Sequence, residues 1–504
     1  MSSEVYSFHT FIFPFSLNEL DYGRSEGFVN HFEKNKNWTS ADVKSHDAVK
    51  MSRELYKEYQ YFYVAARKSI YGLGEGIVHN YSFMNDVVSQ KAHYIISKTR
   101  KGESGVKKTE YDLSVDDIKL KIFNTGIALL ILECKNTKYG EIGDMKDIND
   151  YGRRIVQPFI TGKDGIHDSL TADMLKLHVD DNIEFISDFT EECGGYGDSS
   201  YSYIGGFINE LINYGANDKV SILPIMGDRM YVMSIIGNTA LEIGVEEKII
   251  DYNHFSNSLY ELVFVDPNGK CSCADDDTRD ELLKEASYKR WHGEGSLYYI
   301  TNYSFILGVD KLIKNVPDFV TESFRTHYLQ MFCLAIAQRA SVFRFKDYVA
   351  YIAGFFGKKA DKQTTDNYMY MLSDVTERYI AFESQLYFDE ISPEQQGIEM
   401  YDLMKARLRI KEEVDSLKEQ IDGLNNLANI KSDNRANNTM SALTWIAFWV
   451  SMASLIISSL QITEFKEMYC GTGAFYVVAV ALCVSVAASI VHLYMSYKKN
   501  KRNL

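Results

Sequence analysis

The segment Asp147-Ile-Asn-Asp-Tyr-Gly-Arg-Arg154 combines two arginines with a glycine and several polar side chains. Arginine suits a planar, bidentate contact with phosphate, and Asn149 and Asp150 are candidates for hydrogen bonds to a base or a ribose. Neighbouring residues of a helix point in different directions, so we expect only one of Arg153 and Arg154 to contact the ligand. The alternative is an arginine pair that bridges acidic neighbours across a subunit interface.

A second candidate cluster lies near the turn at residues 293–295. Arg290 supplies a cation and Trp291 supplies a stacking surface, which together suit a nucleotide base. The alternative for Trp291 is a place in the hydrophobic core, where large aromatic side chains are common.

Other motifs give no support for catalysis or for a bound metal. Gly72-Leu-Gly-Glu-Gly76 lacks the spacing of a phosphate-binding loop and suits a helix exit. Cys271-Ser-Cys273 precedes three aspartates, but it lacks the further ligands of a zinc or calcium site. No hydrolase or metalloprotease motif is present. We therefore predict that the protein is not an enzyme and has no metal in its candidate site.

The chain has 504 residues, with 54 basic against 69 acidic side chains and a net charge of −15. So acidic a chain is a poor general binder of nucleic acid, because affinity for phosphate backbones depends on lysine and arginine. The N-terminus lacks the basic and apolar regions of a signal peptide. The seven cysteines are consistent with reduced thiols in the cytosol.

The apolar pattern predicts an α/β or α+β domain over residues 1–315, followed by a helical bundle with a stalk helix over residues 316–440. Strands are predicted at residues 5–15, 118–123, 127–133, 220–224, 230–236 and 260–265. Helices are predicted from Asp318, with a break at Pro393. Ile410, Val414 and Leu417 begin a heptad pattern that continues to Ala428. This pattern predicts either a coiled-coil stalk or an amphipathic helix packed on its own domain.

Two apolar segments near the C-terminus, residues 442–462 and 474–497, contain no Asp, Glu, Lys or Arg. Each reaches the length of about 20 residues that a transmembrane helix requires. The basic residues around them place both termini in the cytoplasm by the positive-inside rule. We therefore predict a transmembrane hairpin with a basic tail over residues 441–504, in a multi-pass protein of the bacterial inner membrane.

This organisation resembles the CorA family of divalent-cation channels. The stretches that carry the resemblance are Asn434-Arg-Ala-Asn-Asn-Thr-Met-Ser-Ala-Leu-Thr444 and Tyr497-Lys-Lys-Asn-Lys-Arg-Asn-Leu504. The resemblance implies a homopentamer whose first span lines a central pore, with Mg²⁺ as a conducted or regulatory ion. The family's Gly-Met-Asn tripeptide is absent, which argues against ordinary Mg²⁺ uptake. A divalent-cation (Mg²⁺) transporter of the CorA family is nevertheless the alternative prediction.

The N-terminal part resembles the CorA-type membrane effectors associated with type III CRISPR systems. The matching stretches are Gly126-Ile-Ala-Leu-Leu-Ile-Leu-Glu133, Ile148-Asn-Asp-Tyr-Gly-Arg-Arg-Ile155 and Gly295-Ser-Leu-Tyr-Tyr-Ile-Thr-Asn-Tyr-Ser304. This resemblance implies an ion channel for antiviral defence that opens on binding a nucleotide second messenger, such as an adduct of S-adenosylmethionine with AMP.

Small and weakly polar side chains recur at helical spacing along the first apolar segment and predict a pore lining. The predicted lining comprises Asn437, Met440, Thr444, Phe448, Ser451, Ser454, Leu455, Ser458 and Gln461, with Phe448 or Leu455 as the gate. Glu464 and Glu467 are predicted at the outer mouth. The alternative is that the small residues only allow close helix packing.

Overall fold

The computed structural model describes residues 4–17, 26–43, 52–73, 76–102, 105–156, 170–189, 206–227, 229–237, 257–356 and 362–461. The strands are β1 (Ser7–Leu17), β2 (Trp38–Ser40), β3 (Val78–Phe83), β4 (His93–Gly102), β5 (Gly105–Phe123), β6 (Ile127–Asn136), β7 (Met174–Asp180), β8 (Ile183–Asp188), β9 (Ile222–Pro224), β10 (Tyr231–Ile236), β11 (Ser287–Tyr288), β12 (Ser296–Ile300) and β13 (Ser304–Val309). The α-helices are α1 (Glu26–Glu33), α2 (Arg53–Gln60), α3 (Val64–Tyr71), α4 (Asn85–Lys91), α5 (Ile142–Gly152), α6 (Gly206–Asn213), α8 (Asn257–Phe264), α9 (Asp276–Ala286), α10 (Asp318–Ser323), α11 (Leu329–Phe356), α12 (Lys362–Gln385), α13 (Gln395–Arg407) and α14 (Ile410–Gln461). Short helical turns are η3 (His292–Glu294) and η4 (Ile313–Asn315), and η5 (Phe324–Tyr328) is a π-helical turn.

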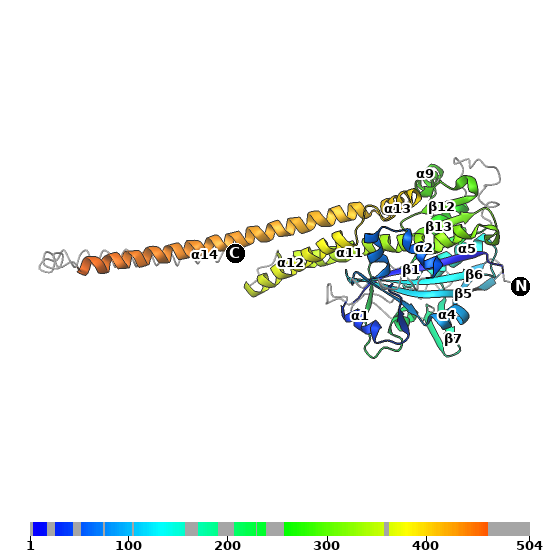
Figure 1. Cartoon of the computed structure of the whole chain (residues 1–504), viewed down its shortest axis with the longest axis horizontal. Helices are drawn as coiled ribbons and strands as arrows, with labels where there is room; N and C mark the ends of the chain where they lie inside the picture. The colour runs from blue at the N-terminus through cyan, green and yellow to red at the C-terminus, as the bar shows by residue number, and fades with distance from the viewer. Residues whose placement is uncertain are drawn as a thin grey trace. The chain divides into compact units, whose positions relative to one another are not determined.

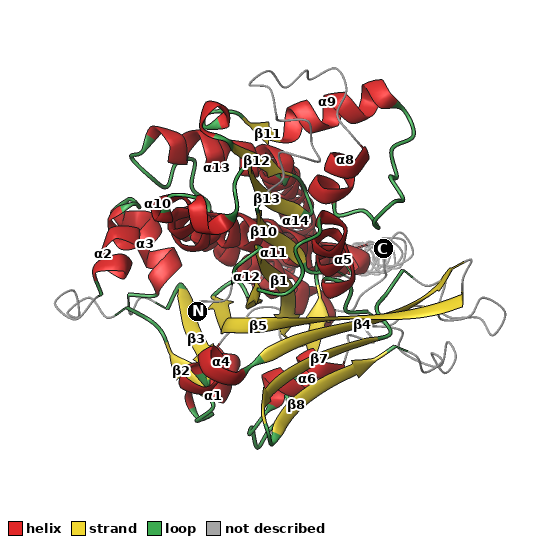
Figure 2. Ribbon diagram, turned by 90° about the vertical axis from the view of Figure 1, so that its right-hand side faces the viewer, coloured by secondary structure: helices red, strands yellow, loops and turns green. Residues whose placement is uncertain are grey.

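One 13-stranded mixed sheet organises the N-terminal part of the chain. Its main path runs β11-β12-β13-β10-β1-β6-β5-β4-β7-β8. Strand β10 pairs in parallel with β13, whereas β1 pairs antiparallel with both β10 and β6. Figure 2 shows β4 and β5 as long neighbouring strands, with the shorter β7 and β8 beside β4. Because β10 and β13 are parallel, the loops that precede them meet at one edge of the sheet.

Strand β1 has a different helix on each of its two faces. His9 hydrogen-bonds to Asn149 of α5, and Phe11 lies on the same face, against the last residue of α5. Phe8, on the opposite face, lies 4.3 Å from the guanidinium of Arg325 in η5. Successive side chains of a strand alternate between faces, so the sheet is covered on both faces here. That double covering explains why the neighbouring strands β6 and β10 are apolar at most positions.

The described chain divides into two units. The first comprises Met1–Val349 with Asp374–Lys418, and the second comprises Ala350–Ser373 with Glu419–Leu504. Figure 1 labels the sheet of the first unit and the long helices α11, α12 and α14. Between α13 and α14, Arg409 has a positive φ of 53°, a conformation that non-glycine residues rarely adopt.

The heptad pattern of α14 is buried within the single chain. Its members are Ile410, Val414, Leu417, Ile421, Leu424 and Ala428, each at most 8% exposed. In the first unit, Glu413 pairs with Lys346 of α11, and Lys418 lies 3.8 Å from Glu383 of α12. The structure therefore favours the amphipathic helix packed on its own chain over the coiled-coil stalk.

Most of the predicted strands are present. Strands β5 and β6 flank the turn at Asn124-Thr125-Gly126, where Gly126 has a φ of 81°. The predicted strand at residues 260–265 is wrong, because Tyr260 lies in helix α8. That short apolar run has the length of a strand or of a buried helix, and its periodicity cannot separate the two. Tertiary packing favours the helix, which buries Leu259, Leu262 and Val263.

The prediction of a C-terminal transmembrane hairpin is wrong. Among the described residues, no helix is both long enough and apolar enough to cross a bilayer. The first predicted span forms the end of α14, a 52-residue helix whose earlier turns carry many charged and amide side chains. The second predicted span, residues 474–497, lies outside the described residues. The predicted fold class, the membrane-protein and ion-channel classes and the inner-membrane location are corrected with it.

The predicted pore residues share a single helix. All of them lie on α14, and Asn437, Met440, Thr444, Phe448, Ser451, Ser454 and Ser458 are exposed in the single chain. Leu455 and Gln461 belong to the same helix, but their side chains are not described, and Glu464 and Glu467 lie outside the described residues. Their spacing reflects one stripe of a long helix, and a stripe of small residues does not by itself define a pore.

Gly152, the last residue of α5, packs closely against the sheet. A Cβ atom at this position would lie 2.7 Å from Cζ of Phe11 and 3.0 Å from Cδ1 of Ile96. We expect Gly152→Ala to lower the free energy of unfolding by about 1–3 kcal/mol, because added volume in a close-packed core forces side chains to shift. Urea denaturation followed by circular dichroism measures the change.

Gly354→Ala in α11 is the matched control, since a Cβ atom there would meet nothing within 4 Å. Replacing a glycine inside a helix by alanine is expected to stabilise the protein by about 0.5–1 kcal/mol. Equal effects of the two substitutions would contradict the close packing of α5 at Gly152.

Candidate functional site: an arginine-lined cavity

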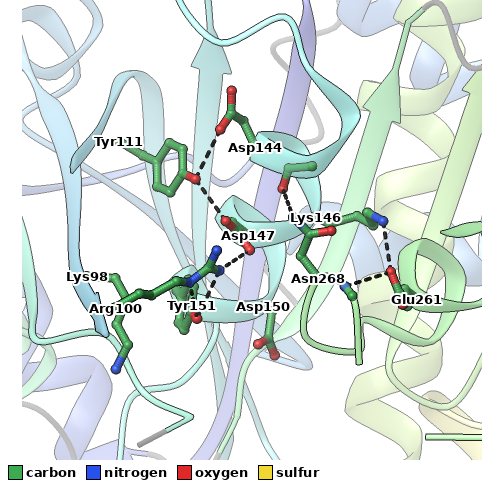
Figure 3. A network of polar contacts seen from close by, with 12 residues as sticks. Lys98, Arg100, Tyr111, Asp144, Lys146, Asp147, Asp150, Tyr151, Glu261 and Asn268 are labelled. Atoms are coloured by element: carbon green, nitrogen blue, oxygen red, sulfur yellow. Dashed lines mark hydrogen bonds and ion pairs between the residues drawn. The ribbon is translucent and has the colours of Figure 1, made fainter. Parts of the chain in front are cut away.

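Polar contacts on two sides hold helix α5, whose C-terminus carries the predicted arginines. On one side, Arg100 of β4 donates to Asp147 at 2.5 Å, and Tyr111 of β5 donates to the same carboxylate at 2.9 Å. On the other side, Lys146 donates to Glu261 of α8 at 2.8 Å, with both side chains buried. Figure 3 shows these contacts reaching α5 from both directions. They determine where the last turn of the helix places Arg153.

Arg153 lines a polar cavity of about 310 Å³ at the edge of the sheet. The other arginines in its wall are Arg229, in the segment before β10, and Arg339 of α11. Tyr303, in the turn before β13, also contributes to the wall. The backbone joins these segments, because Met230 N donates to the carbonyl of Arg153 at 2.8 Å. The cavity thus brings together residues from four separate parts of the sequence.

The cavity is strongly cationic. Arg153 and Arg154 are buried, and Arg229 and Arg339 are partly buried. Burial lowers the pKa of Arg153 to about 10, and the neighbouring Arg154 and Arg229 oppose its charge further. Arg153 still carries its proton at neutral pH. Three guanidinium groups that share one cavity repel one another at short range, so an anion placed between them would be strongly favoured.

Asp150 lies beside these arginines and is already engaged in an ion pair. Arg154 donates to its Oδ1 atom through Nε at 2.9 Å and through a terminal nitrogen at 2.7 Å. Nε of Arg153 lies 3.9 Å from the same oxygen and has no hydrogen-bond partner among the described residues. Burial raises the pKa of Asp150, whereas the positive charges of the neighbouring arginines act to lower it. Asp150 and Asp266 both attract Arg153, whereas Arg154 and Arg229 repel it.

The predicted residues at the C-terminal end of α5 have different roles in the structure. Arg153 lines the cavity, whereas Arg154 forms its ion pair with Asp150 inside the protein. Asn149 faces the sheet, where its Oδ1 atom accepts from Ser234 at 2.9 Å and bonds to His9 at 2.7 Å. Asn149 and Asp150 therefore stabilise the positions of the helix and of the arginines.

Arg290 and Trp291 lie apart from the arginine-lined cavity. Arg290 pairs with Glu399 of α13 at 2.9 Å, and its guanidinium lies 5.8 Å from the centre of the Trp291 ring. Trp291 is 38% exposed and lines a second, larger cavity. It is therefore a surface residue and not part of the core.

Sequence reasoning missed Arg229, Arg339 and Tyr303. Arg339 had a usable signal, because it interrupts the apolar run of α11, and a charged residue there needs a partner or a function. Arg229 follows a turn residue, Gly227, and Tyr303 lies within a stretch used only for the family resemblance. Their proximity depends on the parallel pairing of β10 with β13, which no local pattern reveals.

Comparison with models of known protein families finds no match to this chain. Comparison with curated proteins finds no match either. The resemblance to CorA-type channels therefore stays a prediction. Among the described residues, no group of three or more His, Cys, Asp or Glu side chains could hold a metal ion. The geometry of the arginine-lined cavity is thus the main guide to function.

Proposed function

We propose that the N-terminal unit is a sensor that binds a phosphate-bearing nucleotide in the arginine-lined cavity. The observation that carries this proposal is the convergence of Arg153, Arg229 and Arg339 on one cavity in a chain with a net charge of −15. Arginine is the preferred side chain for phosphate, because its planar donors match the phosphate oxygens. An acidic surface repels most anions, so a local cationic cavity favours selective binding of one anion.

The uncharged wall of the cavity suits the nucleoside part of such a ligand. Tyr303 is 45% exposed and lies 5.7 Å from the guanidinium of Arg153, so its ring can stack on a base beside a bound phosphate. Asn302 adds an amide with both donors and acceptors. The volume of about 310 Å³ lies at the lower end of small-ligand sites, which suits one phosphorylated nucleoside.

Arg339 gives the bound ligand a direct contact with a long helix. It belongs to α11, which has 28 residues. A ligand that binds one position of this helix more tightly than another would shift the population between them, by no more than that difference in affinity. The proposal is therefore a ligand-dependent change in the helical part of the protein, and it includes no membrane step.

Calorimetry with a panel of ligands tests this function. The panel comprises inorganic phosphate, AMP, ATP, cyclic oligoadenylates and the adduct of S-adenosylmethionine with AMP. We expect one nucleotide to bind, and we expect Arg339→Gln and Arg229→Gln each to weaken it about 10- to 100-fold, since a hydrogen bond to a charged group contributes about 1.5–3 kcal/mol. Affinity should also fall as salt is raised.

The matched control is Arg407→Ala, which removes a partly exposed arginine that pairs with Glu285 and does not line the cavity. We expect this variant to bind like the wild type. Circular dichroism of every variant separates lost binding from lost folding. Absence of binding to the whole panel, or equal weakening by the control, would refute the proposal.

A further inference from the structure

A second cavity in the first unit is larger than the arginine-lined cavity and differs from it in chemistry. Its volume is about 470 Å³, and it shares no lining residue with the arginine-lined cavity. Aromatic side chains form much of its wall: Tyr61, Trp291, Tyr298, Phe319, His327 and Tyr328. They come from the end of α2, the loop before η3, strand β12, helix α10 and the π-helical turn η5. We call this space the aromatic cavity.

The wall around His327 is neutral. Its ring stacks on Tyr61 with centroids 4.0 Å apart and an interplanar angle of 21°. Burial lowers the pKa of His327 to about 4, so the ring carries no charge at neutral pH. η5 is a π-helical turn, and such turns occur frequently at functional sites. The turn places His327 and Tyr328 on the same cavity.

The charged groups of the aromatic cavity are mainly acidic. Glu294 and Asp310 line it, against one cation, Lys311. In the described part of the chain, neither carboxylate forms an ion pair or a side-chain hydrogen bond. The nearby Arg290 is already neutralised by Glu399. The balance of formal charge in the wall is therefore negative.

Gly295 makes room for one of these carboxylates. It has a φ of 76°, and a Cβ atom there would lie 2.2 Å from Cγ of Asp310. The backbone closes the same contact, since Asp310 N donates to the carbonyl of Gly295 at 3.0 Å. Only glycine fits both the conformation and the space, and the Asp310 carboxylate is thereby held at the cavity wall.

We propose that the aromatic cavity is a second binding site and that its ligand is a small organic cation of the alkylated-ammonium type. The negative faces of aromatic rings attract a cation that is weakly hydrated, and aromatic cages bind quaternary ammonium groups in this way. The carboxylates of Asp310 and Glu294 add attraction for positive charge. A metal ion would gain at most the carboxylates of Asp310 and Glu294 in exchange for its water, because no group of three or more acidic, His or Cys side chains that could hold a metal ion is present among the described residues. An anion would be repelled.

The test uses choline and phenyltrimethylammonium as probes and 3,3-dimethyl-1-butanol as the neutral analogue of choline. Saturation-transfer NMR on the full chain measures binding of each probe. We expect both cations to bind and the neutral alcohol to bind at least tenfold more weakly. Equal binding of choline and the alcohol would overturn the proposal, as would the absence of saturation transfer to both cations.

Two variants locate the binding. Trp291→Leu and Asp310→Asn are each expected to weaken phenyltrimethylammonium about 5- to 30-fold, the effect of losing a partly desolvated cation–π or charge contact. Trp291 is 38% exposed and Asp310→Asn keeps the shape of the side chain, so both variants should fold. Tyr63→Leu, at an exposed tyrosine outside the cavity, is the control and should bind like the wild type. Unchanged binding in both cavity variants would refute the site.

This proposal is independent of the nucleotide sensor. Arg339→Gln should leave the binding of choline unchanged, and Asp310→Asn should leave nucleotide binding unchanged. The binding tests of the two sites therefore have independent outcomes.

Discussion

Glu261→Gln is expected to lower the free energy of unfolding by about 3–5 kcal/mol, the cost of leaving one member of a buried ion pair without its partner. Lys146 and Glu261 are each only 5% exposed, and their Nζ and Oε2 atoms lie 2.8 Å apart. The same carboxylate oxygen accepts from the backbone N–H of Gly269 at 3.1 Å. A neutral amide would leave the Lys146 ammonium buried and uncompensated.

Urea denaturation followed by circular dichroism checks this effect. Glu4→Gln is the matched control, because Glu4 pairs with Lys314 at 2.5 Å but the two side chains are 35% and 56% exposed. Exposed pairs contribute little, so the control should cost less than about 1 kcal/mol. The double variant Lys146→Met with Glu261→Leu should recover much of the loss, since apolar replacement of a buried pair is often neutral. Equal losses in Glu261→Gln and in the control would contradict the ion pair's role in holding α5.

The second large effect concerns pH. Burial lowers the pKa of His9 from 6.5 to about 4, although the hydrogen bond to Asn149 opposes the shift. The unfolded chain therefore binds a proton between about pH 6.5 and 4 where the folded protein does not. The contribution of His9 to the free energy of unfolding is fully present above pH 6.5 and falls as the pH is lowered through this window. The loss amounts to about 3 kcal/mol by about pH 4, at 1.36 kcal/mol for each pKa unit.

The structural cause is a hydrogen-bond chain that needs a neutral ring. His9 Nδ1 bonds to Asn149 Oδ1 at 2.7 Å, so Nδ1 carries the proton. Nε2 then accepts from Ser7 Oγ at 2.7 Å, and Ser7 Oγ in turn accepts from Asn136 at 2.8 Å. A second proton, on Nε2, would turn this atom from an acceptor into a donor, and the hydroxyl hydrogen of Ser7 would then lose its buried acceptor.

Urea denaturation of the wild type and of His9→Gln at intervals from pH 4 to pH 7.5 tests this contribution. The difference between the two curves is the quantity that matters, because other groups titrate in both proteins. His327 acts in the same direction as His9, whereas the buried carboxyls of Glu58, Asp147 and Asp150 have raised pKa values and act oppositely. We expect the gap between the curves to change by about 3 kcal/mol. Parallel curves would show that His9 does not titrate as described.

Local patterns predicted those parts of the fold that local chemistry decides. The predicted strands at residues 118–123 and 127–133 leave only Asn124-Thr125-Gly126 between them, and Gly126 adopts the positive φ that glycine allows without cost. The helical break at Pro393 was predicted because proline lacks an N–H, and α12 and α13 end and begin on either side of it. The run at Tyr260 was mispredicted, because its conformation depends on what covers it.

The same division applies to the candidate site. Arg153 was selected as a candidate from its residue type and its neighbours in the sequence. Helical geometry also predicted that Arg153 and Arg154 would point in different directions. Arg229, Tyr303 and Arg339 join it only because β10 lies parallel to β13 and α11 packs beside them. Membrane insertion was inferred from apolar composition alone, and the described helices do not support it.

For this protein, the sequence by itself determined the turn at Gly126, most of the strands, the apolar stripe of α14 and the arginines that follow α5. Each depends on residues within a few positions of one another, where backbone sterics and side-chain spacing act directly. Only the tertiary structure decided which arginines share a cavity and which aromatic rings surround a second one. Those groupings unite residues more than a hundred positions apart, and the free energy that brings them together comes from burying the whole sheet between its helices.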